Sequence, residues 1–231
     1  MSGSATAVRV RRPRIDVRNQ PDRQDDAGQW LHSWTVDMGD YIEDRYSRSG
    51  RIWHGMSARC EEGSAFRALS PWYEGCICAF TDYQHFAAWC QLQYGYGLKD
   101  ENGMSWELDK DIIEPGNKVY RPERCCFVPK GLNSLLTMSG ATRGRYPLGV
   151  SVIPSRKKIF RARVKKHNRE YALGYFDSAT QAHRAWQSAK IEIILETAIS
   201  LPSEMMRVAT GLRKHAALIC ADLTAGVETI R

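Results

Sequence analysis

Residues 159–165 read Ile-Phe-Arg-Ala-Arg-Val-Lys, and within this stretch apolar and basic side chains alternate. Because successive side chains of a strand point to opposite faces, this period of two predicts a strand with one apolar and one cationic face. Residues 148–153 and 171–176 also have the composition of strands, and the connections 154–158 and 167–170 have hairpin lengths. The sequence therefore predicts a three-stranded antiparallel meander.

A helix is predicted to follow the third strand. Asp177 and Ser178 form a good N-cap pair, and the residues after them place a stripe of small and apolar side chains on one helix face. The stripe consists of Ala182, Ala185, Trp186, Ala189 and Ile193. Small residues let a helix lie close on a sheet, so we expect a two-layer module in which this stripe covers the apolar face of the meander.

The other face of the predicted sheet presents Arg161, Arg163 and Lys165 to solvent. Five more basic residues flank it in or beside the predicted connections: Arg156, Lys157, Lys158, Lys166 and Arg169. The chain as a whole has a formal net charge of +7, yet residues 143–190 hold twelve basic and two acidic residues, a charge of +10. Self-repulsion on this scale is seldom left without a counter-charge.

This concentration of charge predicts an anionic partner. A twisted sheet fits the roughly 12 Å major groove of duplex DNA, where Arg pairs with guanine and loop Lys and Arg neutralise phosphates. We therefore predict double-stranded DNA as the partner of the cationic face, with RNA or an acidic protein as the alternatives.

Four pieces of this region together resemble a known domain family. They are Tyr-Pro-Leu-Gly-Val at 146–150, Phe-Arg-Ala-Arg-Val-Lys at 160–165, Leu-Gly-Tyr-Phe-Asp-Ser at 173–178 and Ala-Thr-Gln-Ala-His-Arg-Ala-Trp at 179–186. The module is similar to the plant ethylene-response-factor type of DNA-binding domain, which has three strands and a helix and reads the major groove with its sheet. The resemblance implies that Arg161, Arg163 and Lys165 contact DNA. Such domains also occur fused to HNH homing endonucleases of phages.

The preceding region, residues 31–142, has a formal charge of −4. Its main features are Ile-Trp-His-Gly-Met-Ser-Ala-Arg-Cys at 52–60, an aromatic-rich helix predicted to begin after Asp82, Leu-Asp-Lys-Asp-Ile at 108–112 and Tyr-Arg-Pro-Glu-Arg-Cys at 120–125. In this order they resemble a phage class of HNH endonuclease, over about residues 50–136. The family core is a β-hairpin and a helix that hold one divalent metal ion, usually Mg²⁺, against a phosphodiester.

The resemblance implies a catalytic set in this region. Asp109 takes the place of a metal ligand, and Asp111 that of a second ligand or an orienting carboxylate. Asn133 takes the place of a residue on a helix that contacts the metal ion or the phosphate. Asn117 takes the place of a residue that holds the loop. Lys110 stands where a catalytic His is usual; a Lys with a pKa near 10.4 is protonated at neutral pH and accepts no proton, although it can contact phosphate.

Further departures from the family pattern are Arg124 for Asn, Phe127 for Trp, and Leu135 and Leu136 for the late Asn pair. Two hypotheses follow. The first is a DNA endonuclease or nickase that uses Mg²⁺ or Mn²⁺ at a site selected by the basic sheet. The second is a nuclease-inactive DNA-binding regulator or anti-host factor derived from such an enzyme, with no metal cofactor. A homodimer and a host-protein partner stay open.

The predicted fold class is α+β, in four segments. These are a disordered basic arm at 1–29, an HNH-like ββα-metal domain at 30–142, the sheet-and-helix module at 143–200 and a C-terminal helix at 201–231, which packs on a domain or dimerises. No run of about 18 apolar residues and no secretory signal occurs. We therefore expect no membrane partner and a cytoplasmic, nucleoid-associated protein of the phage-infected bacterial cell.

Overall fold

The computed structural model describes residues 46–136, 145–155, 157, 159–166 and 169–230, together with two short strands near the N-terminus. These strands, β1 (Arg23–Gln24) and β2 (Trp30–Leu31), pair antiparallel within an N-terminal unit that ends at Met38. Most of the predicted basic arm lies outside the described residues, so its disorder stays a prediction. The remaining elements belong to a second unit, which begins at Gly39.

Three helices open the second unit, and each begins at a side chain that caps it. α1 (Arg48–Cys60), α2 (Ala65–Leu69) and α3 (Tyr83–Leu92) have Ser47, Ser64 and Asp82 as N-caps. Each cap accepts a hydrogen bond from a backbone N–H of the first turn, which satisfies one of the free amides at a helix start. A short 3-10 turn, η1 (Pro71–Tyr73), follows α2. The predicted helix start at Asp82 is confirmed.

An aromatic core holds these helices together. Phe86 and Trp89 on α3 are buried. Their rings contact Phe80, whose centroid lies 5.0 Å from that of Phe86 and 5.2 Å from that of Trp89. Phe127 closes the cluster at 5.8 Å from Trp89. Such tilted and edge-to-face pairs stabilise a core beyond the area they bury.

A hairpin and a helix come next. β4 (Glu107–Asp109) and β6 (Cys126–Val128) pair antiparallel, with Leu108 opposite Phe127, and α4 (Lys130–Leu136) follows β6 directly. Between the two strands the chain runs through β5 (Val119–Tyr120), which pairs parallel with β3 (Ile77–Cys78). The segment 110–125 is therefore a long connection between β4 and β6, and the pairing of β5 with β3 fixes it near its middle.

The predicted meander and its helix are confirmed. β7 (Val150–Val152), β8 (Phe160–Lys166) and β9 (Arg169–Phe176) form an antiparallel sheet in the order β7-β8-β9. α5 (Ala179–Ser200) covers one face of this sheet, and its N-cap Ser178 is the predicted one. Ala162 and Val164 are buried beneath it, and Val164 packs with Trp186 and Ile193. β9 begins at Arg169, earlier than expected.

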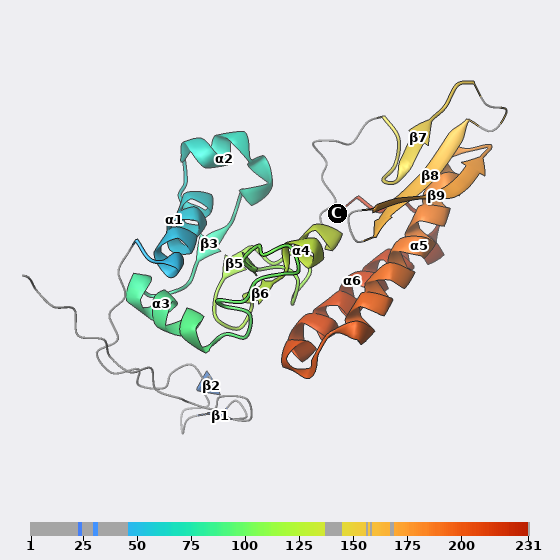
Figure 1. The fold of residues 1–231 in the computed structure, drawn as a ribbon. Coiled ribbons are helices and arrows are strands. Elements are labelled where there is room, and N and C mark those ends of the chain that lie inside the picture. Colours follow the sequence, from blue (N-terminus) through green and yellow to red (C-terminus); the bar gives the residue numbers. More distant parts are fainter. Residues whose placement is uncertain are drawn as a thin grey trace, which may run out of the picture. The chain divides into compact units, whose positions relative to one another are not determined.

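The C-terminal helix is also confirmed. After the 3-10 turn η3 (Ser203–Met205), α6 (Met206–Ala225) runs back along α5, and Figure 1 shows the two helices side by side. Ile194 of α5 and Leu212 of α6 are fully buried in the same cluster as Ile112 and Val128. Residues from three of the predicted segments therefore share one core. In the described part of the chain, no helix has the length and apolar content needed to cross a membrane.

Candidate nucleic-acid interface and buried carboxylate segment

A row of cationic side chains lies on β8. Arg161, Arg163 and Lys165 point to the face of the sheet opposite α5, because Ala162 and Val164 between them are buried against the helix. Arg163 and Lys165 are exposed and Arg161 is half-buried. We call this row the cationic face. The period of two in the sequence therefore placed these three residues correctly.

The cationic face also holds a carboxylate, that of Glu170, whose position on the sheet was not predicted. Glu170 Oε2 lies 2.9 Å from Nη1 of Arg163, and its Oε1 lies 3.5 Å from Nη2 of Arg161. The strand composition predicted Glu170 in the connection 167–170, but β9 already begins at Arg169. In the observed register Glu170 sits in β9, opposite Lys165. The earlier start of β9 thus places an acidic residue on the sheet instead of in a connection.

The other predicted DNA contacts are not all on this face. Lys166 lies on the helix side, where its ammonium pairs with Glu196 of α5, and this hydrogen bond raises the pKa of Lys166. Arg169 is opposite Lys166 at the end of the hairpin and is exposed. Lys157 is exposed in the connection between β7 and β8. Arg156 and Lys158 lie outside the described residues.

Asp109, the predicted metal ligand, is buried at the end of β4. Only 8% of the residue is exposed, and its Oδ1 accepts hydrogen bonds from the backbone N–H of Asp111 at 2.9 Å and of Ile112 at 2.7 Å. Burial, and to a lesser extent the Asp111 carboxylate, raise the pKa of Asp109 to about 6. This carboxylate therefore closes a turn at the start of the 110–125 segment.

Three further predicted residues, Lys110, Asp111 and Asn117, make contacts in the same segment. Asn117 donates from Nδ2 to the carbonyl oxygens of Lys110 at 2.7 Å and Val119 at 2.8 Å, so it links two parts of the 110–125 segment. The Lys110 ammonium lies 3.2 Å from Asp111 Oδ2. Lys110 and Asp111 therefore form an ion pair between neighbouring residues.

Asn133 lies elsewhere on the hairpin. It donates from α4 to Oε2 of Glu107 on β4, at 3.0 Å. Glu107 was not predicted as a functional residue. It is two residues before Asp109 and therefore on the same face of the strand, which is the signal that would have found it.

These groups do not fit a Mg²⁺ site as they are arranged. A hard cation needs several free oxygen ligands around it. Here the Oδ1 of Asp109 already accepts hydrogen bonds from two backbone N–H groups. The Lys110 ammonium, which lies beside the Asp111 carboxylate, repels a cation. In the described ranges, no three His, Cys, Asp or Glu side chains converge in a way that would hold a metal ion. Asp109 and Asp111 are therefore placed as parts of a folded turn.

α6 lies along the 110–125 segment and adds contacts to it. His215 donates from Nε2 to the carbonyl oxygen of Asp111 at 3.0 Å, and the Arg207 guanidinium donates to that of Glu123. The Lys214 ammonium lies 2.6 Å from Glu114 Oε2, and this hydrogen bond lowers the pKa of Glu114. The segment is thus held by a helix about 100 residues further along the chain.

No protein-family model, curated protein or solved structure matches the chain. What it binds therefore has to be inferred from its own surface.

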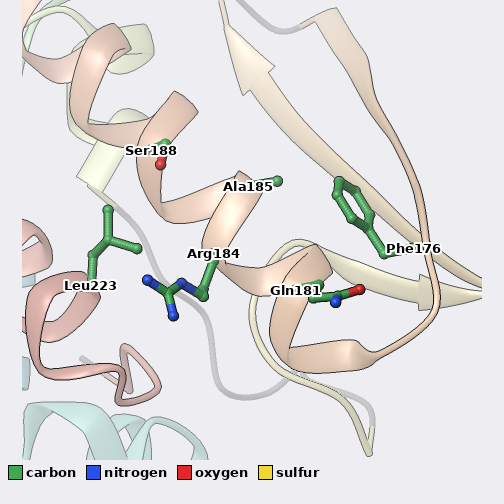
Figure 2. Close-up of a pocket in the computed structure, with 6 residues that line it drawn as sticks. All are labelled: Phe176, Gln181, Arg184, Ala185, Ser188 and Leu223. Carbon is green, nitrogen blue, oxygen red and sulfur yellow. The ribbon is translucent and has the colours of Figure 1, made fainter.

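A hollow lies beside α5, lined by residues of β9, α5 and α6 (Figure 2). They are Phe176, Gln181, Arg184, Ala185, Ser188 and Leu223. Since Arg184 is the one charged side chain among them, this hollow has no acid-base pair and no set of metal ligands.

Proposed function

We propose that this protein binds double-stranded DNA through the cationic face of its three-stranded sheet. The observation that supports the proposal is the row formed by Arg161, Arg163 and Lys165 on the side of the sheet that α5 leaves open. α5 covers the other side, so the row is presented by a rigid two-layer support. A binding site on a strand that is packed from behind holds its side chains more accurately than one on a loop.

The dimensions of the row suit the major groove. Side chains two residues apart on a strand are separated by about 7 Å, so Arg161 and Lys165 are about 13 Å apart along β8. Base pairs follow one another at about 3.4 Å, and the row therefore spans about four of them. The groove is about 12 Å wide and admits a sheet or ribbon. The major groove of duplex RNA is deep and narrow and does not admit one, which favours DNA.

We further propose that the hairpin of β4 and β6 with α4 is the HNH-like part of the chain, and that it serves as a scaffold rather than as a nuclease centre. The hydrogen bonds of Asp109 and the ion pair of Lys110 with Asp111 support this proposal. Of the two hypotheses from the sequence, the geometry favours the DNA-binding protein. We propose in addition that the protein comes from a phage and acts as a regulator or an anti-host factor. We also propose that it lies at the nucleoid.

Salt dependence tests the binding proposal. The affinity for a DNA duplex is measured by fluorescence anisotropy between about 50 mM and 200 mM salt, with an RNA duplex of the same sequence as a competitor. Each phosphate that is neutralised lowers the slope of log affinity against log salt by about 0.9. We expect the slope to be about −3 or steeper, and the RNA duplex to compete only weakly. Equal competition by RNA, or no binding at about 50 mM salt, would contradict the proposal.

Plasmid cleavage tests the scaffold proposal. Supercoiled plasmid is incubated with the protein and Mg²⁺ or Mn²⁺, and we expect it to stay supercoiled while it is bound. Nicking that depends on the metal and disappears in Asp111→Ala would show that the segment rearranges into a nuclease centre.

A further inference from the structure

The cationic face contains one feature that duplex affinity alone does not explain. Glu170 is the single acidic residue in β7, β8 and β9. A carboxylate in the middle of a surface that contacts phosphates weakens the attraction to them. Exposed ion pairs of this kind also contribute little to folding stability. Neither duplex affinity nor stability therefore accounts for Glu170.

Its contacts indicate what it does. One carboxylate oxygen faces the Arg161 guanidinium and the other faces that of Arg163. Lys165 is directly opposite Glu170 in the register, yet the carboxylate reaches back along β8 to the two arginines. Ala172 stands opposite Arg163, and this small residue leaves room for the Arg163 side chain to lean towards Glu170. The three side chains form one linked group on the open face.

A linked pair of arginines is suited to reading bases. Arg recognises guanine through two parallel hydrogen bonds to O6 and N7, which require its planar group in one orientation. A free Arg side chain loses much rotamer freedom when it is fixed in this way, whereas one already held loses less. A carboxylate on the same face can also accept from the N4 amino group of cytosine. The chemistry of the group therefore matches G·C base pairs in the major groove.

We propose that Glu170 is a positioning residue that determines sequence specificity: it holds Arg161 and Arg163 in the orientation that reads G·C pairs. This inference rests on the DNA-binding function proposed above. The inference predicts opposite changes in the affinity for any duplex and in the preference for one sequence. Without the carboxylate, binding to any duplex becomes tighter, because one negative charge is gone. The preference for one sequence over another becomes weaker, because the arginines are no longer oriented.

The experiment uses the full chain and a pool of random-sequence DNA duplexes. The wild-type protein selects its preferred duplexes from the pool, and the affinity for the enriched sequence is compared with that for a scrambled one. Glu170→Gln is measured on the same two duplexes. Glu192→Gln serves as the matched control, because Glu192 is an exposed residue of α5, on the other side of the sheet, and its substitution changes the net charge equally.

We expect the wild type to enrich G·C-containing sequences. In Glu170→Gln the affinity for the scrambled duplex should rise, while the ratio between the two duplexes should fall by about tenfold. Glu192→Gln should keep the wild-type ratio. An unchanged ratio in Glu170→Gln, or binding by the wild type without any sequence preference, would overturn the role of Glu170 and leave duplex binding intact. If none of the proteins binds duplex DNA, the proposed function fails and this inference fails with it.

Discussion

Gly211 of α6 lies directly against the main chain of Ile112. A Cβ atom at position 211 would be 2.1 Å from the Ile112 carbonyl oxygen and 2.7 Å from the α-carbon of Ile113. No real side chain approaches backbone so closely, so helix and segment touch here only because residue 211 is glycine. This contact is where α6 meets the 110–125 segment.

The first prediction follows from this contact. In an exposed helix, Gly→Ala stabilises by about 0.5–1 kcal/mol, because Gly is a poor helix former. Gly211→Ala should instead lower the free energy of unfolding by about 1–3 kcal/mol, since the helix has to move away from Ile112. Gly55→Ala in α1 is the control, because its Cβ would meet nothing within 4 Å. Urea denaturation measures both, and a gain in both variants would show that α6 does not pack as described.

The second prediction concerns the support of the cationic face. Gly149, which precedes β7, has φ +77°, and a Cβ there would lie 2.0 Å from Cδ1 of Trp186. Gly116 also has φ +77°, but its Cβ would meet nothing within 4 Å. In both variants the left-handed backbone of the alanine should lower the free energy of unfolding by about 1–2 kcal/mol. Gly149→Ala should cost about 1–3 kcal/mol more and change the fluorescence of Trp186. Equal losses in the two variants would contradict the packing of Trp186 under the sheet.

The third prediction separates a structural from a catalytic Asp109. Asp109→Asn keeps the oxygen that accepts from Asp111 and Ile112, whereas Asp109→Ala leaves two amides without an acceptor. Each unsatisfied buried group costs about 1–3 kcal/mol, so Asp109→Ala should be destabilised by about 2–4 kcal/mol and Asp109→Asn much less. Asp111→Ala, at a half-exposed side chain, is the control. Asp109→Ala with wild-type stability would favour a metal-ligand role instead.

A fourth prediction is a pH dependence from Lys190. This residue of α5 is buried, its ammonium donates to the carbonyl oxygen of Leu135, and burial lowers its pKa to about 8. The same side chain has a pKa near 10.4 in an unfolded chain. Between about pH 8 and pH 10.4 the unfolded state therefore binds more protons, and the stability of the folded state rises with pH.

Lys190→Met isolates this contribution. The free energy of unfolding of the wild type minus that of the variant should increase from about pH 8 to about pH 10, by up to about 3 kcal/mol. Chemical denaturation at the two pH values measures it. A difference that stays constant with pH would show that the Lys190 ammonium is solvated in the folded protein.

Local sequence patterns predicted the parts of this fold that depend on neighbouring residues. The alternation around Ala162 and Val164 sets the faces of β8, and the side chains of Asp82 and Ser178 start their helices. The start of β9 at Arg169 was missed because nothing in the sequence between Lys166 and Glu170 fixes where the strands stop, and this hid the place of Glu170 on the sheet.

The burial of Asp109 was missed for a different reason. It depends on how the 110–125 segment packs, and the contacts of that segment with α6 join residues about 100 positions apart, such as Asp111 and His215. No local pattern reports such a contact. The hydrogen bonds of Asp109 are local, since they come from Asp111 and Ile112, but its burial depends on packing between distant parts of the chain.

Duplex DNA binding by the pair Arg161→Ala and Arg163→Ala, combined in one protein, tests the central claim most directly. Lys166→Ala is the control for position, because it removes a basic residue of the same strand from the helix side. At about 50 mM salt we expect the double variant to lose at least about tenfold in duplex affinity, with a shallower salt dependence, and Lys166→Ala to bind much like the wild type. Unchanged affinity in the double variant would show that the cationic face is not the DNA-binding surface.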